Sequence, residues 1–195
     1  MYKYIDLLLT LFPQEPRYFT PYNLPTTFVG HPVIESDVVN GVKGDFRKRH
    51  NIPEENRLFL VLPGSRHNEV ERLLPTFLDV VKNLHERYND FSFVIPTVST
   101  VSAQVKEMVK QSGLPIEIVE GTKERHDAFK SGDVAIAASG TVALELAIVD
   151  VPHIIAYKVP KLTEWLARHF IHIQFVNLSN ILLGKEVVPE LLQQD

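Results

Sequence analysis

The most constraining feature of this sequence is the alternation, from residue 57 onward, of short apolar runs with longer stretches of helical period. Runs of this length predict β-strands, and apolar residues repeated every three or four positions predict helices. The predicted strands are 58–62, 91–96, 116–119, 134–138 and 153–157, and the predicted helices are 70–87, 101–111, 124–130 and 142–149. Strands that alternate with helices form a parallel sheet through right-handed crossovers. The sequence therefore predicts a Rossmann-like, doubly wound α/β domain.

The composition changes along the chain and predicts three parts. Residues 1–30 contain four prolines and two short strand-like runs, the second at 26–29, which is too little for a domain. Residues 31–56 are polar and charged and include a basic run at 47–50, a pattern typical of a linker and an entry helix. Residues 57–195 contain the predicted sheet.

Composition also excludes several classes of function. The 195 residues contain no cysteine, which excludes a disulfide framework, a zinc–thiolate site and a cysteine nucleophile. A formal net charge of -4 provides no global cationic field for a nucleic acid. The apolar N-terminal stretch is too short to span a bilayer, and the prolines that follow it do not match a signal peptide. We therefore expect a cytoplasmic protein with small-molecule or protein partners and no nucleic acid.

The turn after the predicted strand 58–62 carries side chains suited to a phosphorylated ligand. In a doubly wound sheet the ligand lies beyond the carboxyl ends of the strands. Gly64 allows the backbone to approach a ligand, Ser65 offers a hydroxyl, and Arg66 offers a bidentate donor to phosphate.

The turn after the predicted strand 134–138 has a similar character. Ser139, Gly140 and Thr141 lead directly into a helix, whose free N–H groups and positive end attract an anion. Glu145 follows one turn inside this helix and is suited to accept hydrogen bonds from a ribose diol.

Each turn has a purely structural alternative, in which glycine makes the bend, serine or threonine caps the helix and Glu145 is an exposed helix residue. The two turns together favour a phosphorylated ligand that carries hydroxyl groups. Neither the P-loop pattern nor the glycine pattern of dinucleotide-binding proteins occurs in the chain, so the sequence predicts neither of those classes.

Five motifs occur here in the order found in lipid-A-disaccharide synthases. They are FVGHP (28–32), LPGSR (62–66), ASGT (138–141) followed by Leu144 and Glu145, LSNI (178–181) and VPELLQ (188–193). The sequence resembles this family of inverting GT-B glycosyltransferases over almost its whole length. The resemblance implies transfer from UDP-2,3-diacylglucosamine to 2,3-diacylglucosamine 1-phosphate with release of UDP, without a metal or another cofactor.

The resemblance also implies a role for each site residue. Arg66 would neutralise the UDP diphosphate or the acceptor phosphate and, with Asn180, would be a catalytic residue. Asn180 would donate a hydrogen bond to the nucleotide or sugar, and a loop-capping asparagine is its alternative. The implied nucleotide-binding residues are Gly64, Ser65, Arg66, Ser139, Gly140, Thr141 and Glu145.

Compared with the family, the chain is expected to be a fragment. Residues 1–30 resemble only the last strand and loop of an N-terminal domain, and the segment that follows 188–193 in the family is absent. The general base would lie in the missing part. We therefore expect a chain that binds UDP, is inactive alone and self-associates through its exposed interface. Two alternatives remain open: another UDP-sugar GT-B enzyme, such as a UDP-N-acetylglucosamine epimerase or a cell-wall transferase, and a non-catalytic nucleotide-binding remnant.

The stretch 165–175 mixes large apolar and basic residues. One interpretation, suggested by the lipid substrates that the resemblance implies, is a peripheral contact of this stretch with the inner membrane. The spacing of its apolar residues favours the other interpretation, a core-facing helix and following strand with a basic outer face. His169 and His172 lie three residues apart, and without a third ligand they do not predict a metal site.

Overall fold

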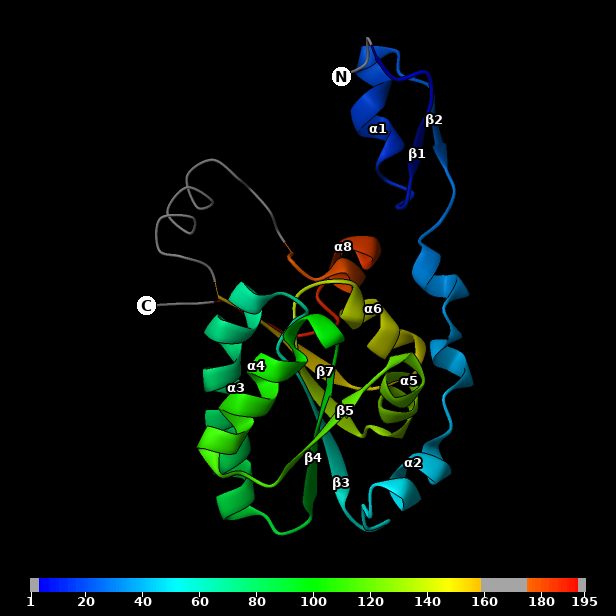
Figure 1. Cartoon of the computed structure of the whole chain (residues 1–195). Helices are drawn as coiled ribbons and strands as arrows, with labels where there is room; N and C mark the ends of the chain where they lie inside the picture. The colour runs from blue at the N-terminus through cyan, green and yellow to red at the C-terminus, as the bar shows by residue number, and fades with distance from the viewer. Residues whose placement is uncertain (1–3, 159–174, 193–195) are drawn as a thin grey trace. The chain divides into compact units, whose positions relative to one another are not determined.

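The computed structural model describes residues 4–158 and 175–192 and contains two compact units, Met1–Ser36 and Asp37–Asp195 (Figure 1). In the first unit, strands β1 (Leu8–Thr10) and β2 (Thr26–Phe28) pair in parallel. Helix α1 (Pro16–Phe19) and the 3-10 helix η1 (Thr20–Tyr22) connect them, and a second 3-10 helix, η2 (Pro32–Glu35), follows.

The second unit is built on a six-stranded parallel sheet. Its strands are β3 (Arg57–Leu62), β4 (Phe91–Thr97), β5 (Ile116–Glu120), β6 (Val134–Ala138), β7 (His153–Tyr157) and β8 (Glu190–Leu192). They lie in the order β5-β4-β3-β6-β7-β8, so the direction in which strands are added reverses between β3 and β6. The doubly wound fold and the five predicted strands are confirmed. The pattern does not predict β8, because three residues are too few to show a period.

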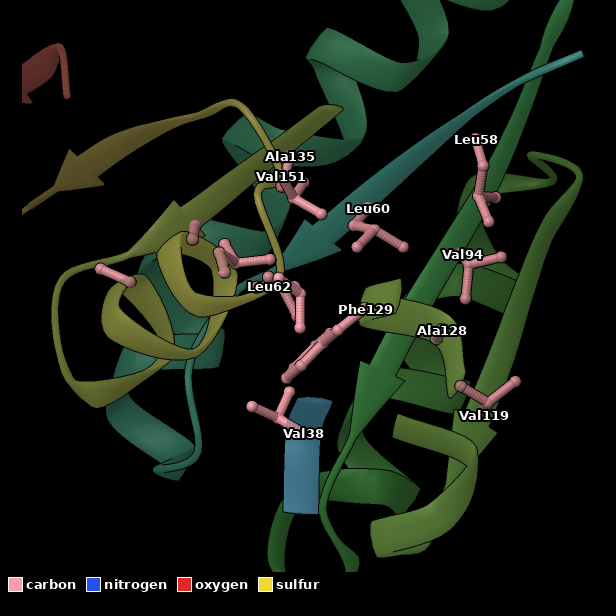
Figure 2. Close-up of a cluster of buried hydrophobic side chains, with 14 of the residues drawn as sticks. Val38, Leu58, Leu60, Leu62, Val94, Val119, Ala128, Phe129, Ala135 and Val151 are labelled. Carbon is pink, nitrogen blue, oxygen red and sulfur yellow. The ribbon is translucent and has the colours of Figure 1, made fainter. Parts of the chain in front are cut away.

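Helices cover both faces of this sheet (Figure 1). They are η3 (Asp37–Asn40), α2 (Lys43–Arg49), α3 (His67–Arg87), α4 (Ser99–Ser112), α5 (Thr122–Ser131), α6 (Thr141–Ile148) and α8 (Leu178–Leu183). Successive residues of a strand point to opposite faces. Accordingly, Phe59 and Val61 of β3 pack with α3 and α4, whereas Leu60 and Leu62 pack with α5 and α6. Figure 2 shows the core on the side of Leu60 and Leu62, in which Phe129 of α5 faces the strand residues.

Helix α2 is fixed to α5 by ion pairs. Arg49 lies 2.7 Å from Asp127 and 3.0 Å from Glu124, both in α5. Arg47 is buried, pairs with Asp133 at 2.7 Å and donates to the carbonyl oxygens of Pro53 and Asn56. The basic run at 47–50 therefore ties α2 to the unit that contains the sheet.

No helix within residues 4–158 and 175–192 is long and apolar enough to cross a membrane. Residues 165–174 lie outside the described residues, as do His169 and His172. Both interpretations of the stretch 165–175 therefore stay predictions.

Candidate functional site

The turn between β3 and α3 is organised by the carboxylate of Glu69. Its Oε2 atom accepts the backbone N–H groups of Ser65 at 3.1 Å and Arg66 at 3.3 Å, and its Oε1 atom accepts Arg66 Nη1 at 2.6 Å. Gly64 has a φ of 113°, and a Cβ atom there would lie 2.5 Å from Glu69 Oε2. Glycine is therefore required for two reasons: the backbone is left-handed here, and any larger side chain would clash with Glu69. The Arg66 side chain is 79% exposed, so its guanidinium stays accessible to a ligand.

The turn between β6 and α6 presents backbone N–H groups. Helix α6 begins at Thr141, and its N-cap residue, Gly140, has no side chain that could cap the first turn. The first N–H groups of a helix have no partner within the helix, and they carry its positive end. Gly140 has a φ of 150°, and the space where its Cβ would lie is open. The Ser139 hydroxyl donates to the carbonyl oxygen of Val176 at 3.0 Å. The turn therefore offers a ligand its N–H groups, while the serine hydroxyl is engaged within the protein.

Both turns border a single pocket of about 270 Å³. The pocket lies beyond the carboxyl ends of β3 and β6, the neighbouring strands between which the strand order reverses. Ligands of doubly wound sheets bind at this kind of switch point. The structure brings together all seven residues that the resemblance assigned to nucleotide binding: Gly64, Ser65, Arg66, Ser139, Gly140, Thr141 and Glu145.

Three polar residues of the pocket are not among those predicted from the sequence: Glu69, Thr97 and Arg125. Arg125 of α5 lies 3.6 Å from the carboxylate of Glu145, and its guanidinium stands 5.5 Å from the ring centre of Phe129. Thr97 ends β4, is 4% exposed, and its hydroxyl has no hydrogen-bond partner within the described ranges. Thr97 follows directly after the predicted strand 91–96, whereas Arg125 lies within the predicted helix 124–130. The placement of ligands beyond strand ends therefore also indicates Thr97, but it does not indicate Arg125.

Asn180 does not line this pocket in the part of the chain that the structure describes, and the role that the resemblance implies for it stays a prediction. Its side chain is fully buried. Its Oδ1 atom accepts the N–H groups of Val187 at 2.9 Å and Val188 at 3.0 Å. Its Nδ2 atom donates at 2.8 Å to the carbonyl oxygen of Val188 and to Glu190 Oε1. These four bonds use the full capacity of the amide, which is the pattern expected of a loop-capping asparagine.

Comparison with known proteins identifies the family. A family model described as lipid-A-disaccharide synthetase matches residues 1–195. The chain belongs to this family. The lipid-A-disaccharide synthase of Rhodospirillum centenum is 47% identical over 193 residues, which cover 99% of this chain and 48% of that enzyme. The chain thus spans about half the length of the curated relatives it matches.

Solved structures show the same fold at low identity. S. aureus MnaA, in a co-structure with UDP, matches with a TM-score of 0.55 at 16% identity, covering 84% of this chain and 45% of MnaA. WaaG, a glycosyltransferase involved in lipopolysaccharide biosynthesis, matches with a TM-score of 0.54 at 13% identity, covering 83% and 46%. This chain thus shares its fold with GT-B glycosyltransferases and epimerases. The sequence predicts the same fold.

Proposed function

We propose that this chain is the UDP-binding half of a lipid-A-disaccharide synthase. The complete enzyme would transfer diacylglucosamine from UDP-2,3-diacylglucosamine to 2,3-diacylglucosamine 1-phosphate and release UDP. The family match over the whole chain supports the reaction class. The observation that carries the proposal is the convergence of both strand-to-helix turns on one pocket at the switch point of the sheet.

In this pocket, three groups are suited to the diphosphate of UDP. Arg66 supplies an exposed guanidinium, and the N–H groups of Gly140 and Thr141 lie at the positive end of α6. Arg125 adds a second guanidinium to the same pocket. The MnaA structure was obtained with UDP, which supports a nucleotide in a pocket of this fold. We assign the ribose to Glu145, whose carboxylate also borders the pocket.

The transfer inverts the configuration of the sugar. The acceptor hydroxyl oxygen forms a bond with the anomeric carbon, while the bond from that carbon to the UDP oxygen breaks and its electron pair stays on UDP. Negative charge therefore grows on the leaving diphosphate. Fixed N–H dipoles and arginine side chains stabilise such charge, and we propose that they act here without a metal or another cofactor.

The acceptor hydroxyl also has to lose its proton to a base. A positioned base contributes a factor of about 10²–10⁴ in rate. We assign this base to the half of the relatives that the chain does not span. The chain alone is then expected to bind UDP without turnover. The matching assay supplies both lipid substrates and measures UDP release. Release above a protein-free control would contradict the assignment of the base.

We also propose two kinds of surface contact. The family acts on lipid-linked sugars, so we place the complete enzyme at the cytoplasmic face of the inner membrane as a peripheral protein. The chain itself is expected to self-associate through the first unit, where Leu9 of β1 is 55% exposed and Phe28 of β2 is 48% exposed. An isolated pair of short strands with exposed apolar residues favours association.

A further inference from the structure

Glu190, the first residue of β8, holds the segment before α8 by its carboxylate. Its Oε2 atom accepts the N–H group of Val176 at 2.8 Å, and its Oε1 atom accepts that of Asn177 at 3.0 Å. Oε1 also accepts the side-chain amide of Asn180 at 2.8 Å. Asn177 and Asn180 are fully buried. No ion pair joins Glu190 to a cation in the part of the chain that the structure describes. The negative charge of Glu190 is therefore stabilised by three N–H donors, all of which lie in residues 176–180.

This network ends at the pocket. Val176, whose N–H group donates to Glu190, accepts the Ser139 hydroxyl through its carbonyl oxygen at 3.0 Å. Glu190 and Ser139 thus hold the two polar groups of the same residue. Ser139 lines the pocket and leads into the turn at Gly140, whereas Glu190 does not line it.

Asn180 fixes the other side of the network. It accepts the N–H groups of Val187 and Val188, which lie just before β8, and donates to Glu190 within β8. Strand β8 in turn pairs with β7, the neighbour of β6 in the sheet. The carboxylate of Glu190 is therefore held relative to the same sheet that carries Ser139.

We propose that Glu190 is a positioning residue for the diphosphate site. Through Val176 it fixes Ser139, and with it the N–H groups of Gly140 and Thr141, in the orientation that a diphosphate requires. Hydrogen bonds to a charged group depend strongly on distance and angle, so a small shift of this turn weakens diphosphate binding. Ribose binding at Glu145 does not depend on these N–H groups. The inference rests on the proposed function, because it assumes that the pocket takes UDP.

The experiment titrates the full chain with UDP and with uridine by calorimetry. Glu190→Gln keeps the size of the side chain but replaces one carboxylate oxygen by an NH₂ group. This group faces an N–H donor that bonds to Glu190 in the wild type, so that hydrogen bond is lost. We expect UDP affinity to fall about tenfold, the effect of losing a hydrogen bond to a charged group, and uridine affinity to stay unchanged. Glu186→Gln, an exposed carboxylate on the same segment, is the matched control and leaves both affinities unchanged.

A double-mutant cycle tests the route through Ser139. If Glu190 acts through Ser139, Glu190→Gln has little further effect on UDP affinity in a Ser139→Ala background. Glu190→Asp keeps the charge but shortens its reach, and it provides a second variant should Glu190→Gln lose its cooperative thermal transition. Additive losses, equal losses for UDP and uridine, or an unchanged UDP affinity would each overturn the inference. A wild-type chain that does not bind UDP would instead overturn the proposed function, and the inference with it.

Discussion

Arg66 and Glu69 form an ion pair of 2.6 Å at the edge of the pocket. An arginine is charged throughout the physiological pH range, and the hydrogen bond to Glu69 raises the pKa of Arg66 further above its usual value. The same carboxylate accepts the N–H groups of Ser65 and Arg66. Glu69 therefore holds the backbone and the cation of this turn together, and a diphosphate would meet an arginine whose position is already restricted.

Arg66→Ala is expected to weaken UDP binding by about 10- to 100-fold, because charge-assisted hydrogen bonds to the diphosphate are lost. Uridine carries no phosphate, so its affinity should stay the same. Calorimetric titration with both ligands makes the comparison. Arg57→Ala is a suitable control, because Arg57 is an exposed cation at the opposite end of β3. An equal loss for UDP and uridine would remove Arg66 from the diphosphate site.

Glu145→Gln should weaken UDP and uridine by the same factor, because both ligands carry the ribose diol. The substitution keeps the shape of the side chain but removes its charge. Weakening the hydrogen bond from the ribose to this group is expected to lower affinity about three- to tenfold. Titrations with both ligands measure the ratio, with the exposed Glu86→Gln of α3 as the control. Unchanged affinity for both ligands would show that Glu145 is only a helix residue paired with Arg125.

The acid stability of the fold should depend on Asp127. Burial of this carboxylate opposes its ionisation, but hydrogen bonds from Lys123, the Val42 N–H group and Arg49 hold its pKa at about 2, below the usual 3.8. The folded state therefore binds this proton less readily than the unfolded state. Ionised Asp127 stabilises the fold above pH 4, and this contribution disappears as the pH falls from about 4 to about 2.

Asp127→Asn tests this contribution. At pH 7 the variant should unfold with a free energy about 2 kcal/mol lower than the wild type, and the difference should shrink as the pH falls toward 2. Urea unfolding at several pH values measures it, and Asp79→Asn, an exposed carboxylate of α3, serves as the control. A difference that stays constant with pH would mean that the charge of Asp127 does not contribute.

The exposed apolar residues of the first unit predict self-association. Light scattering of the chain should show a mass that rises with concentration, because β1 and β2 leave Leu9 and Phe28 exposed. Leu9→Lys should lower that mass, whereas Val39→Lys, at an exposed valine of the second unit, should not. A monodisperse monomer at high concentration would contradict this prediction.

Most of the fold could be predicted, because buried parallel strands and the helices between them carry clear periods. Phe59 and Leu60 show why: the strand is apolar on both faces, and each residue enters a different core. Strand β8 could not be predicted, since it is short and its position depends on pairing with β7.

The two turns of the pocket could also be predicted, because their residues follow directly after strands. The hydrogen bonds of Asn180 could not, since all four partners lie in residues 187–190, and only the folded chain reveals them. Arg125 was missed for a related reason. Its pairing with Glu145 joins α5 to α6 across the pocket, and no sequence spacing encodes that contact.

The most direct test of the central claim is a calorimetric titration of the wild-type chain with UDP, without added metal, and with UMP and ATP for comparison. We predict saturable binding of UDP that is tighter than that of UMP, since the second phosphate meets Arg66 and the N-terminus of α6, and tighter than that of ATP. Absence of UDP binding, or equal affinity for UDP and UMP, would contradict the assignment of this pocket to the nucleotide diphosphate.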